Sequence, residues 1–91
     1  MNRSGIELRG DVLSQIKNGI DTPSRISYSV NCNWQQLRLF LSEFVDQGLV
    51  VCLVEGETSR KKKRYVITLK GEEVLSCVDN FRRLVGVENG V

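Results

Sequence analysis

Four consecutive segments decide the fold of this chain: NWQQLRLFLSEFVDQG at Asn33–Gly48, LVVCLV at Leu49–Val54, EGETSRKKKR at Glu55–Arg64 and YVITL at Tyr65–Leu69. The first segment has the apolar spacing of an amphipathic helix. The second is short and apolar, as is typical of a buried strand, and the fourth is a second strand after a charged turn. We therefore predict a helix that leads directly into a two-stranded hairpin with a cationic tip.

The helix at 33–48 has clear start and stop signals. Asn33 is a good N-cap, and Gly48 ends the helix. Trp34 lies in the first turn, where we expect it to pack under the preceding helix with its N–H at the rim. The apolar residues that recur at helical spacing, and are predicted to be buried, are Leu37, Leu41, Phe44 and Val45.

Signals outside this stretch predict three more helices. Helix one begins with the capping-box residues Ser4-Gly5-Ile6-Glu7. Thr22-Pro23 starts a short second helix that ends near residue 29, with threonine as the cap and proline in the first turn. Thr68 caps a last helix at about 70–87.

The predicted strands lie near Leu49–Val54 and Lys63–Leu69, and Ile20 is expected to add a strand of one or two residues beside them. The predicted fold class is therefore α+β: a winged helix-turn-helix with a three-helix core, a two-stranded β wing and an additional C-terminal helix. A chain of 91 residues forms a single domain over residues 1–91, because a second domain would lack a core.

Positive charge is concentrated on the hairpin. An apolar fraction of 41% with 26% charged residues is ordinary for a globular protein, and the formal net charge is only +2. Residues 55–64 hold five Lys and Arg residues against two Glu, a local net charge of +3 that leaves −1 for the rest of the chain. A patch of this kind attracts polyanions.

Composition argues against several other classes of protein. No window approaches the roughly 18 apolar residues of a membrane span, and no secretory core follows the first residues, so we expect a cytoplasmic, nucleoid-associated protein with no membrane partner. The chain has no histidine, and Cys32, Cys52 and Cys77 are widely spaced, so we expect no metal site and no cofactor, with Cys32 the most exposed thiol. No nucleophile lies beside a base and no glycine-rich phosphate loop is present, so neither catalysis nor a small-molecule ligand is expected.

Polar residues on the predicted outer face of the 33–48 helix suit the edges of DNA bases. In the major groove Gln pairs bidentately with adenine and Arg with guanine. This face alone is equally compatible with a solvated surface, and the basic hairpin after it favours DNA contact. The predicted DNA-binding residues of this helix are Asn33, Trp34, Gln35, Gln36, Arg38 and Leu39, with Ser42 on the same face.

Two further elements are predicted to contact phosphates. A charged turn also blunts the edge of a hairpin, but five cations in five positions exceed that need. Because side chains alternate along a strand, we expect two or three of the five to touch DNA. Ser24 and Arg25 are additional candidates at the start of helix two, whereas Thr22 is explained by capping. The cations of the wing, residues 56–64, are Arg60, Lys61, Lys62, Lys63 and Arg64.

The last helix has more apolar residues than one buried face requires. Leu75 lies on a second face, opposite a heptad-like seam. Core packing explains one face, and the surplus predicts a homodimer through residues 70–87. Twofold symmetry would then place two 33–48 helices about 34 Å apart in successive major grooves. The seam consists of Val74, Cys77, Val78, Phe81, Leu84 and Val85.

The residues Ser4–Glu7, Asp11–Leu13 and Ile16–Ile26 resemble the opening of small archaeal winged-helix regulators, and the similarity continues through the segments around Trp34 and Tyr65–Gly71. It covers roughly residues 4–80, and its most specific parts are Thr-Pro-Ser-Arg and Thr-x-Lys-Gly, which occur together. The resemblance implies a DNA-binding transcription regulator or chromatin-associated protein, often dimeric through antiparallel pairing of the last helix. The short last helix and the lysine-rich tip depart from the family pattern.

Three hypotheses follow. The first is a regulator of transcription that binds double-stranded DNA, with helix 33–48 in the major groove and the wing at phosphates or the minor groove. The second is an architectural, chromatin-type binder with little sequence preference, which the lysine-rich tip favours. The third is a winged helix whose helix-three surface contacts another protein, against which the scarcity of aromatic residues argues.

Overall fold

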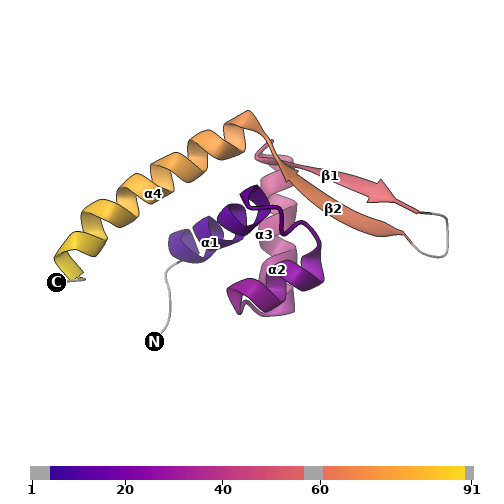
Figure 1. Ribbon diagram of the computed structural model, residues 1–91, viewed down its shortest axis with the longest axis horizontal. Helices are drawn as coiled ribbons and strands as arrows, with labels where there is room; N and C mark the ends of the chain where they lie inside the picture. Colours follow the sequence, from indigo (N-terminus) through magenta and orange to yellow (C-terminus); the bar gives the residue numbers. More distant parts are fainter. Residues whose placement is uncertain (1–4, 57–60, 90–91) are drawn as a thin grey trace.

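The computed structural model describes residues 5–56 and 61–89, the last four as helix backbone. Helices α1, α2 and α3 form a core from which the wing and α4 extend in opposite directions (Figure 1). The predicted α+β class and the order of elements are confirmed. The elements are α1 (Gly5–Lys17), α2 (Pro23–Val30), α3 (Trp34–Asp46), β1 (Val50–Glu55), β2 (Lys62–Ile67) and α4 (Leu69–Asn89).

A tight turn joins α2 to α3 and sets the angle between them. Asn31 adopts the left-handed conformation, with φ of 58°, which asparagine tolerates better than most residues. The N–H of Asn31 donates to the carbonyl of Ser27 at 3.0 Å, and the Ser27 hydroxyl donates to the carbonyl of Cys32 at 3.0 Å. These bonds satisfy backbone groups that the end of α2 leaves free. They make the helix-turn-helix a defined unit.

The core lies between the three helices and the base of the wing. Leu37, Leu41 and Phe44 are buried as predicted, but Val45 is 40% exposed and Phe40, at 4%, takes its place. Phe40 and Val45 lie on opposite borders of the buried stripe, and the periodicity assigned the wrong one of the two to the core. The prediction for Cys32 was also wrong, since this thiol is buried beneath the turn and Cys77 is the exposed one.

The wing is an antiparallel pair in which Val50 lies opposite Ile67 and Cys52 opposite Tyr65. Only the base of β1 is buried: Val51, Leu53 and Val54 are exposed. The prediction of a buried strand was therefore wrong for most of β1. A two-stranded hairpin can bury only one face against the core. Here the hairpin extends beyond the core, so the outer residues of β1 are exposed.

A single residue of the α1–α2 connection pairs with the wing. The N–H of Tyr65 donates to the carbonyl of Asp21 at 2.9 Å. Ile20 forms no strand, contrary to prediction, although its side chain packs against the core. The described connection forms one backbone hydrogen bond with β2, too few for a ladder.

The start of α4 is locked to the start of β1. The hydroxyl of Thr68 accepts from the N–H of Gly71 at 3.0 Å, the capping contact that was predicted, and lies 2.6 Å from the carbonyl oxygen of Gly48. A side chain at Gly71 would collide with the carbonyl oxygen of Leu49. This close approach explains why position 71, three residues after the capping Thr68, is a glycine.

Further along, α4 packs against α1. A Cβ at Gly10 would lie 2.7 Å from a methyl group of Val78. Arg82 donates to the carbonyl of Glu7 at 2.6 Å and to the carboxylate of Asp11 at 2.7 Å. These contacts hold the projecting helix in one direction relative to the core. The predicted cap of α1 by Ser4 lies outside the described residues.

Candidate nucleic-acid interface

The outer face of α3 is polar and open. Gln35, Gln36, Arg38, Leu39 and Ser42 are all exposed, as the helical periodicity predicted. On the opposite face, the Arg9 guanidinium lies 4.5 Å from the centre of the Phe40 ring. Arg9 also forms a two-point ion pair with Glu43, with N–O distances of 2.9 and 3.1 Å. This contact secures α3 against α1 and leaves its outer face free for a ligand.

Asn33 has a structural role that limits its use in binding. Its side-chain oxygen accepts from the N–H of Gln36 at 2.8 Å, which is the predicted N-cap contact. A cap of this type contributes about 1 kcal/mol. The oxygen of Asn33 therefore stabilises the first turn of α3, while the amide group of the Gln36 side chain extends from the same turn.

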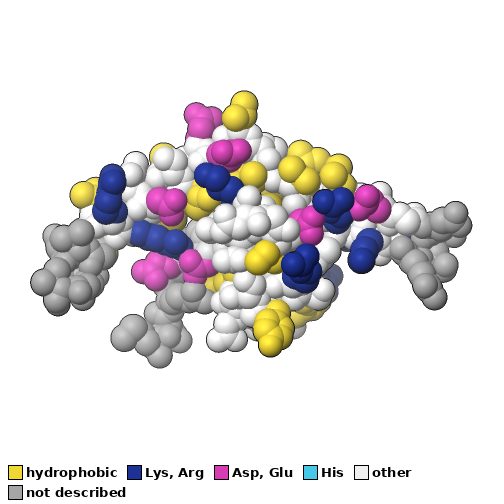
Figure 2. Space-filling view, viewed as in Figure 1, with side chains coloured by type: hydrophobic (Ala, Val, Ile, Leu, Met, Phe, Trp, Pro, Cys, Tyr) yellow, Lys and Arg dark blue, Asp and Glu magenta, His cyan; other side chains and the backbone are white. Residues whose placement is uncertain are grey.

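The described cations of the wing fall into two groups. Lys61, Lys62 and Lys63 are exposed, and no described residue forms an ion pair with them. Arg60 lies outside the described residues. In Figure 2, dark blue side chains lie along the wing and over the neighbouring core, with acidic side chains among them. Three lysine side chains are thus exposed to solvent, and the contact of two or three cations with DNA stays a prediction.

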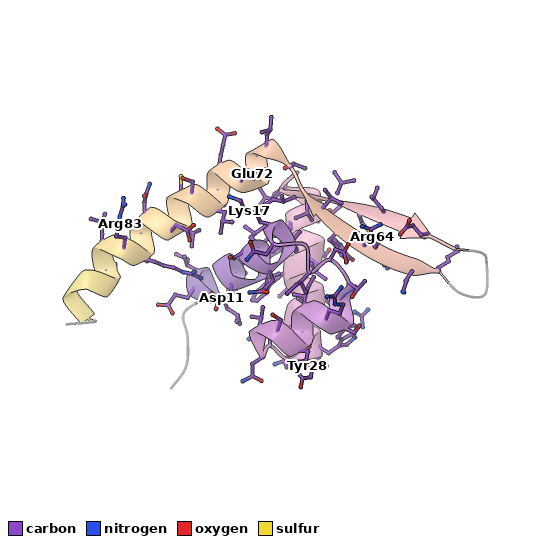
Figure 3. The ribbon with its side chains drawn as sticks, in the orientation of Figure 1. Asp11, Lys17, Tyr28, Arg64, Glu72 and Arg83 are labelled. Atoms are coloured by element: carbon purple, nitrogen blue, oxygen red, sulfur yellow. The ribbon has the colours of Figure 1, made fainter. Side chains whose placement is uncertain are left out.

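Arg64 is different, because it is already paired. Its Nε donates to Asp21 at 2.8 Å and its Nη1 to Glu55 at 3.2 Å. Hydrogen bonds from Arg64 lower the pKa of Asp21, and the pairing raises the pKa of Arg64 itself. Figure 3 shows Arg64 on the wing, close to the core. We therefore assign Arg64 to positioning the wing and not to phosphate contact.

Two adjoining hollows run between α2, α3 and the wing, and together they form what we call the wing groove. The first, of about 420 Å³, is lined by Arg38 and Ser42 of α3 and by Lys63 of β2. The second, of about 750 Å³, is lined by Ser24 and Arg25 of α2 and by the lysines of the wing. Pro23, Trp34 and Lys63 line both. The groove brings α2, α3 and wing candidates onto one surface, whereas Gln35, Gln36 and Leu39 lie outside it.

Trp34 does not pack under α2 as predicted. Its side chain is 49% exposed and lies where the two hollows meet. Pro23, at the start of α2, lines the same two hollows. The first turn of α3 therefore presents its large aromatic ring to the groove.

The groove also contains acidic groups, and they are outnumbered by its Lys and Arg side chains. Asp21 and Glu55 line the second hollow, and both are paired with Arg64. Asp46 lines the first hollow, opposite the cations Arg38 and Lys63. The net charge of the groove is therefore positive, and Asp46 is its carboxylate at the α3 end.

The floor of the first hollow was not predicted from the sequence. It includes Cys52 and Tyr65, which are direct partners across the wing. Burial, followed by a hydrogen bond with the Cys52 side chain, raises the pKa of Tyr65 to about 12. The antiparallel register of the hairpin was the signal that these two residues share a face.

The apolar seam of α4 is divided between two environments. Val78 packs against Gly10 of α1 and belongs to the protomer, together with the buried Leu75. Val74 is partly buried against the core. The exposed members of the predicted seam are Cys77, Phe81, Leu84 and Val85.

Neither a membrane-spanning helix nor a metal site is found among the described residues. No described helix has the length and apolar character of a membrane span. Nor does any group of histidine, cysteine and acidic residues within residues 5–56 and 61–89 have the arrangement of a metal site.

A sequence profile of winged helix-turn-helix proteins matches residues 2–86, almost the whole chain. The chain belongs to the winged helix-turn-helix family. The predicted resemblance is thereby confirmed at the level of the family. No curated protein matches this winged helix in a sequence comparison.

Solved structures share the fold of this winged helix at low sequence identity. The DNA-binding protein Sso10a-2 from Sulfolobus solfataricus has a TM-score of 0.81 and 20% identity, with 97% of this chain and 87% of that chain covered. The protein smu.1704 from Streptococcus mutans has a TM-score of 0.78 and 17% identity, with 96% and 91% covered. MepR from S. aureus, in a complex with DNA, has a TM-score of 0.65 and 15% identity, with 90% and 68% covered. At these identities the likeness establishes the fold.

Proposed function

We propose that this winged helix binds double-stranded DNA and regulates transcription. One observation carries the proposal: Arg38 of α3 and Lys63 of the wing line the same hollow. A duplex can therefore contact α3 and the wing at the same time. Similar structures include a DNA-binding protein and MepR in a complex with DNA, which supports the assignment.

In this proposal α3 enters the major groove. Gln35, Gln36 and Arg38 extend from its outer face and are suited to hydrogen bonds with base edges. Leu39, exposed on the same face, suits the methyl group of thymine. These side chains would supply sequence preference, since phosphate contacts carry no sequence information directly.

Phosphate contacts come from the flanking elements. Arg25 at the start of α2 and Lys61–Lys63 on the wing are exposed cations on either side of the wing groove. Ser24 lies beside Arg25, where the free amides of a helix start favour an anion. Each phosphate that is neutralised releases counterions, so binding depends on salt.

The α4 seam supports a homodimer. Phe81 and Leu84 are exposed at heptad-like spacing on a helix that projects from the core (Figure 1). Pairing of two such helices would bury these side chains and present two α3 helices to a roughly palindromic site. Action on chromosomal DNA places the protein in the cytoplasm, associated with the nucleoid. We assign it a binding role with no catalytic residue.

Titration of a labelled duplex at several salt concentrations tests the proposal. We expect tight binding near 50 mM salt and a linear fall of log affinity with log salt, with a slope of about −0.9 for each phosphate contacted. Selection from random duplexes should return a motif. No binding at low salt, or affinity independent of salt, would remove the proposal.

The architectural alternative is favoured by one observation, the three exposed lysines of the wing that have no ion-pair partner among the described residues. Such a tip binds any phosphate backbone. A selection that returns no motif, together with the same steep dependence on salt, would establish this alternative in place of the regulator.

A further inference from the structure

A half-exposed indole at the centre of a cationic groove calls for a ligand with a flat apolar face. Trp34 lines both hollows of the wing groove and has 49% of its side chain exposed. Leaving a large aromatic ring in water forgoes favourable burial. Arg25, Arg38 and Lys63 line the same groove, so the ligand also carries negative charge.

Intact duplex DNA does not offer such a face. In the duplex, base faces are stacked on one another, and proteins contact base edges, sugars and phosphates. An indole stacks on a base when the base is unpaired, and this contact is common in single-strand binding sites. The ring of Trp34 is therefore poorly matched to duplex DNA and well matched to an unpaired base.

We propose that the wing groove binds single-stranded DNA, with an unpaired base stacked on Trp34. Arg25 of α2 and Lys61–Lys63 of the wing, on either side of the groove, contact the phosphates that flank this base, together with Arg38 of α3. The activity is separate from duplex binding, and the chain would have it whether or not α3 recognises a duplex sequence.

The polar groups at the α3 end of the groove complete the site. Asp46 and Ser42 line the first hollow beyond Trp34. A carboxylate accepts hydrogen bonds from the exocyclic amino group of cytosine, and a hydroxyl accepts or donates. The other carboxylates of the groove, Asp21 and Glu55, share the single guanidinium of Arg64, and the remaining negative charge is outweighed by Arg25, Arg38 and the wing lysines.

The choice of DNA over RNA, unlike the stacking on Trp34, rests on the proposed binding of a DNA duplex by α3. A helix enters the major groove of B-form DNA, whereas the major groove of an RNA helix is too deep and narrow for side chains. Gln35 and Gln36 are exposed beside the wing groove on the same helix as Trp34. A strand in the groove would thus continue from a DNA duplex, as at a junction of single and double strand.

The test uses the fluorescence of Trp34, the only tryptophan in the chain. The probes are a thymidine oligonucleotide of about 12 nucleotides and an abasic oligonucleotide of equal length, which keeps the phosphates and lacks the bases. We expect the first to quench the fluorescence and to bind about 5- to 150-fold more tightly than the second. Equal affinity and equal quenching would overturn the proposal. A uridine oligoribonucleotide that binds more tightly than the DNA would overturn the choice of DNA.

Variants separate stacking from charge, with binding measured by anisotropy of a labelled oligonucleotide. Trp34→Leu should remove the advantage of thymidine over abasic strands, and Trp34→Phe should keep most of it. Tyr28→Leu is the matched control, because Tyr28 is 89% exposed on α2 but lines neither hollow of the wing groove. Duplex affinity, measured in parallel, should fall by a smaller factor than single-strand affinity for Trp34→Leu and should change little for Tyr28→Leu.

The outcomes distinguish this proposal from duplex binding. If Trp34→Leu weakens duplex and single-strand binding by the same factor, Trp34 is a general DNA contact and the proposal fails. If duplex binding is absent while the thymidine advantage persists, the proposed regulator fails and this inference stands. Thermal unfolding checks each variant for folding, and the comparison of thymidine with abasic strands on the unaltered protein decides the matter even if one variant is unstable.

Discussion

The Nε of Arg64 lies 2.8 Å from the carboxylate of Asp21, and this ion pair joins the wing to the connection before α2. The carbonyl of Asp21 also accepts from the N–H of Tyr65. One residue therefore holds the base of the wing through both its side chain and its main chain. In Figure 3, Arg64 lies where the wing meets the core. The position of the wing lysines relative to α3 depends on this link.

Acid should weaken the link between wing and core. The hydrogen bond from Arg64 lowers the pKa of Asp21 below its ordinary value of 3.8. Because the folded-state pKa is depressed, the stabilisation is complete above that ordinary value and is lost as pH falls through the folded-state pKa. Asp21→Asn should flatten the fall of the melting temperature below about pH 4, leaving the dependence that comes from Glu43, whose pKa is lowered by its hydrogen bond with Arg9. Asp46→Asn, at an exposed carboxylate, is the control; equal curves for both variants would contradict the assignment.

Gly71 should tolerate no side chain. Its Cα approaches the carbonyl oxygen of Leu49 so closely that a methyl group collides with backbone, which cannot move without shifting β1. Gly71→Ala should lower the free energy of unfolding by about 1–3 kcal/mol, measured by urea denaturation. Lys70→Ala, at the exposed neighbouring position, should change it by less than about 0.5 kcal/mol. Similar values for the two would show that α4 can move away from β1.

The α4 seam should control the oligomeric state. Leu84 is 71% exposed and lies on the side of α4 away from the buried Leu75. Leu84→Glu should change the mass in solution from a dimer to the 10.3 kDa monomer, measured by light scattering after size exclusion. Ser76→Glu adds the same charge at an exposed position outside the seam and should leave the dimer intact. A monomeric native protein would remove the dimer proposal.

Alkali should destabilise the wing through Tyr65. Burial and the hydrogen bond with Cys52 raise the pKa of this phenol to about 12 from an ordinary 10. Because the unfolded chain loses the proton first, stability should fall as pH rises from about 10 to about 12. Tyr65→Phe should lose this dependence in urea denaturation at a series of pH values. An unchanged slope in the variant would show that Tyr65 is not the group responsible.

Local signals in the sequence were sufficient for the elements and for most of the core. Asn33 caps α3 and Thr68 caps α4 as predicted, because a cap depends on residues within one turn. Thr22 occupies the N-cap position of α2, but its side chain does not form the predicted capping hydrogen bond. The stripe of Leu37, Leu41 and Phe44 follows from helical periodicity, which needs no tertiary information.

The errors concern residues whose environment depends on distant elements. Trp34 and Leu53 have apolar side chains, but exposure is decided by how far other elements cover them, and here the described elements leave Trp34 49% and Leu53 43% exposed. The pairing of Arg64 with Asp21 joins residues 43 positions apart, so no local pattern predicts it. The same limit hid the wing groove, whose lining comes from three elements.

Base contacts and phosphate contacts should respond differently to mutation. Gln36 is exposed on the outer face of α3, and Lys62 is exposed on the wing. Gln36→Ala should weaken binding to the preferred duplex by about 1–3 kcal/mol and relax the preference at one base pair, because a bidentate contact is lost. Lys62→Ala should weaken all duplexes alike and reduce the slope of log affinity against log salt by about 1.

Both variants are compared by anisotropy with the selected duplex and a scrambled duplex of the same length. Lys70→Ala removes an exposed cation at the start of α4, outside the wing groove, and serves as the charge control. If Gln36→Ala weakens the selected and scrambled duplexes equally, α3 contributes no sequence preference and the architectural alternative is favoured. If Lys62→Ala alters preference without changing the salt slope, the wing contacts bases and its assignment to phosphates is wrong.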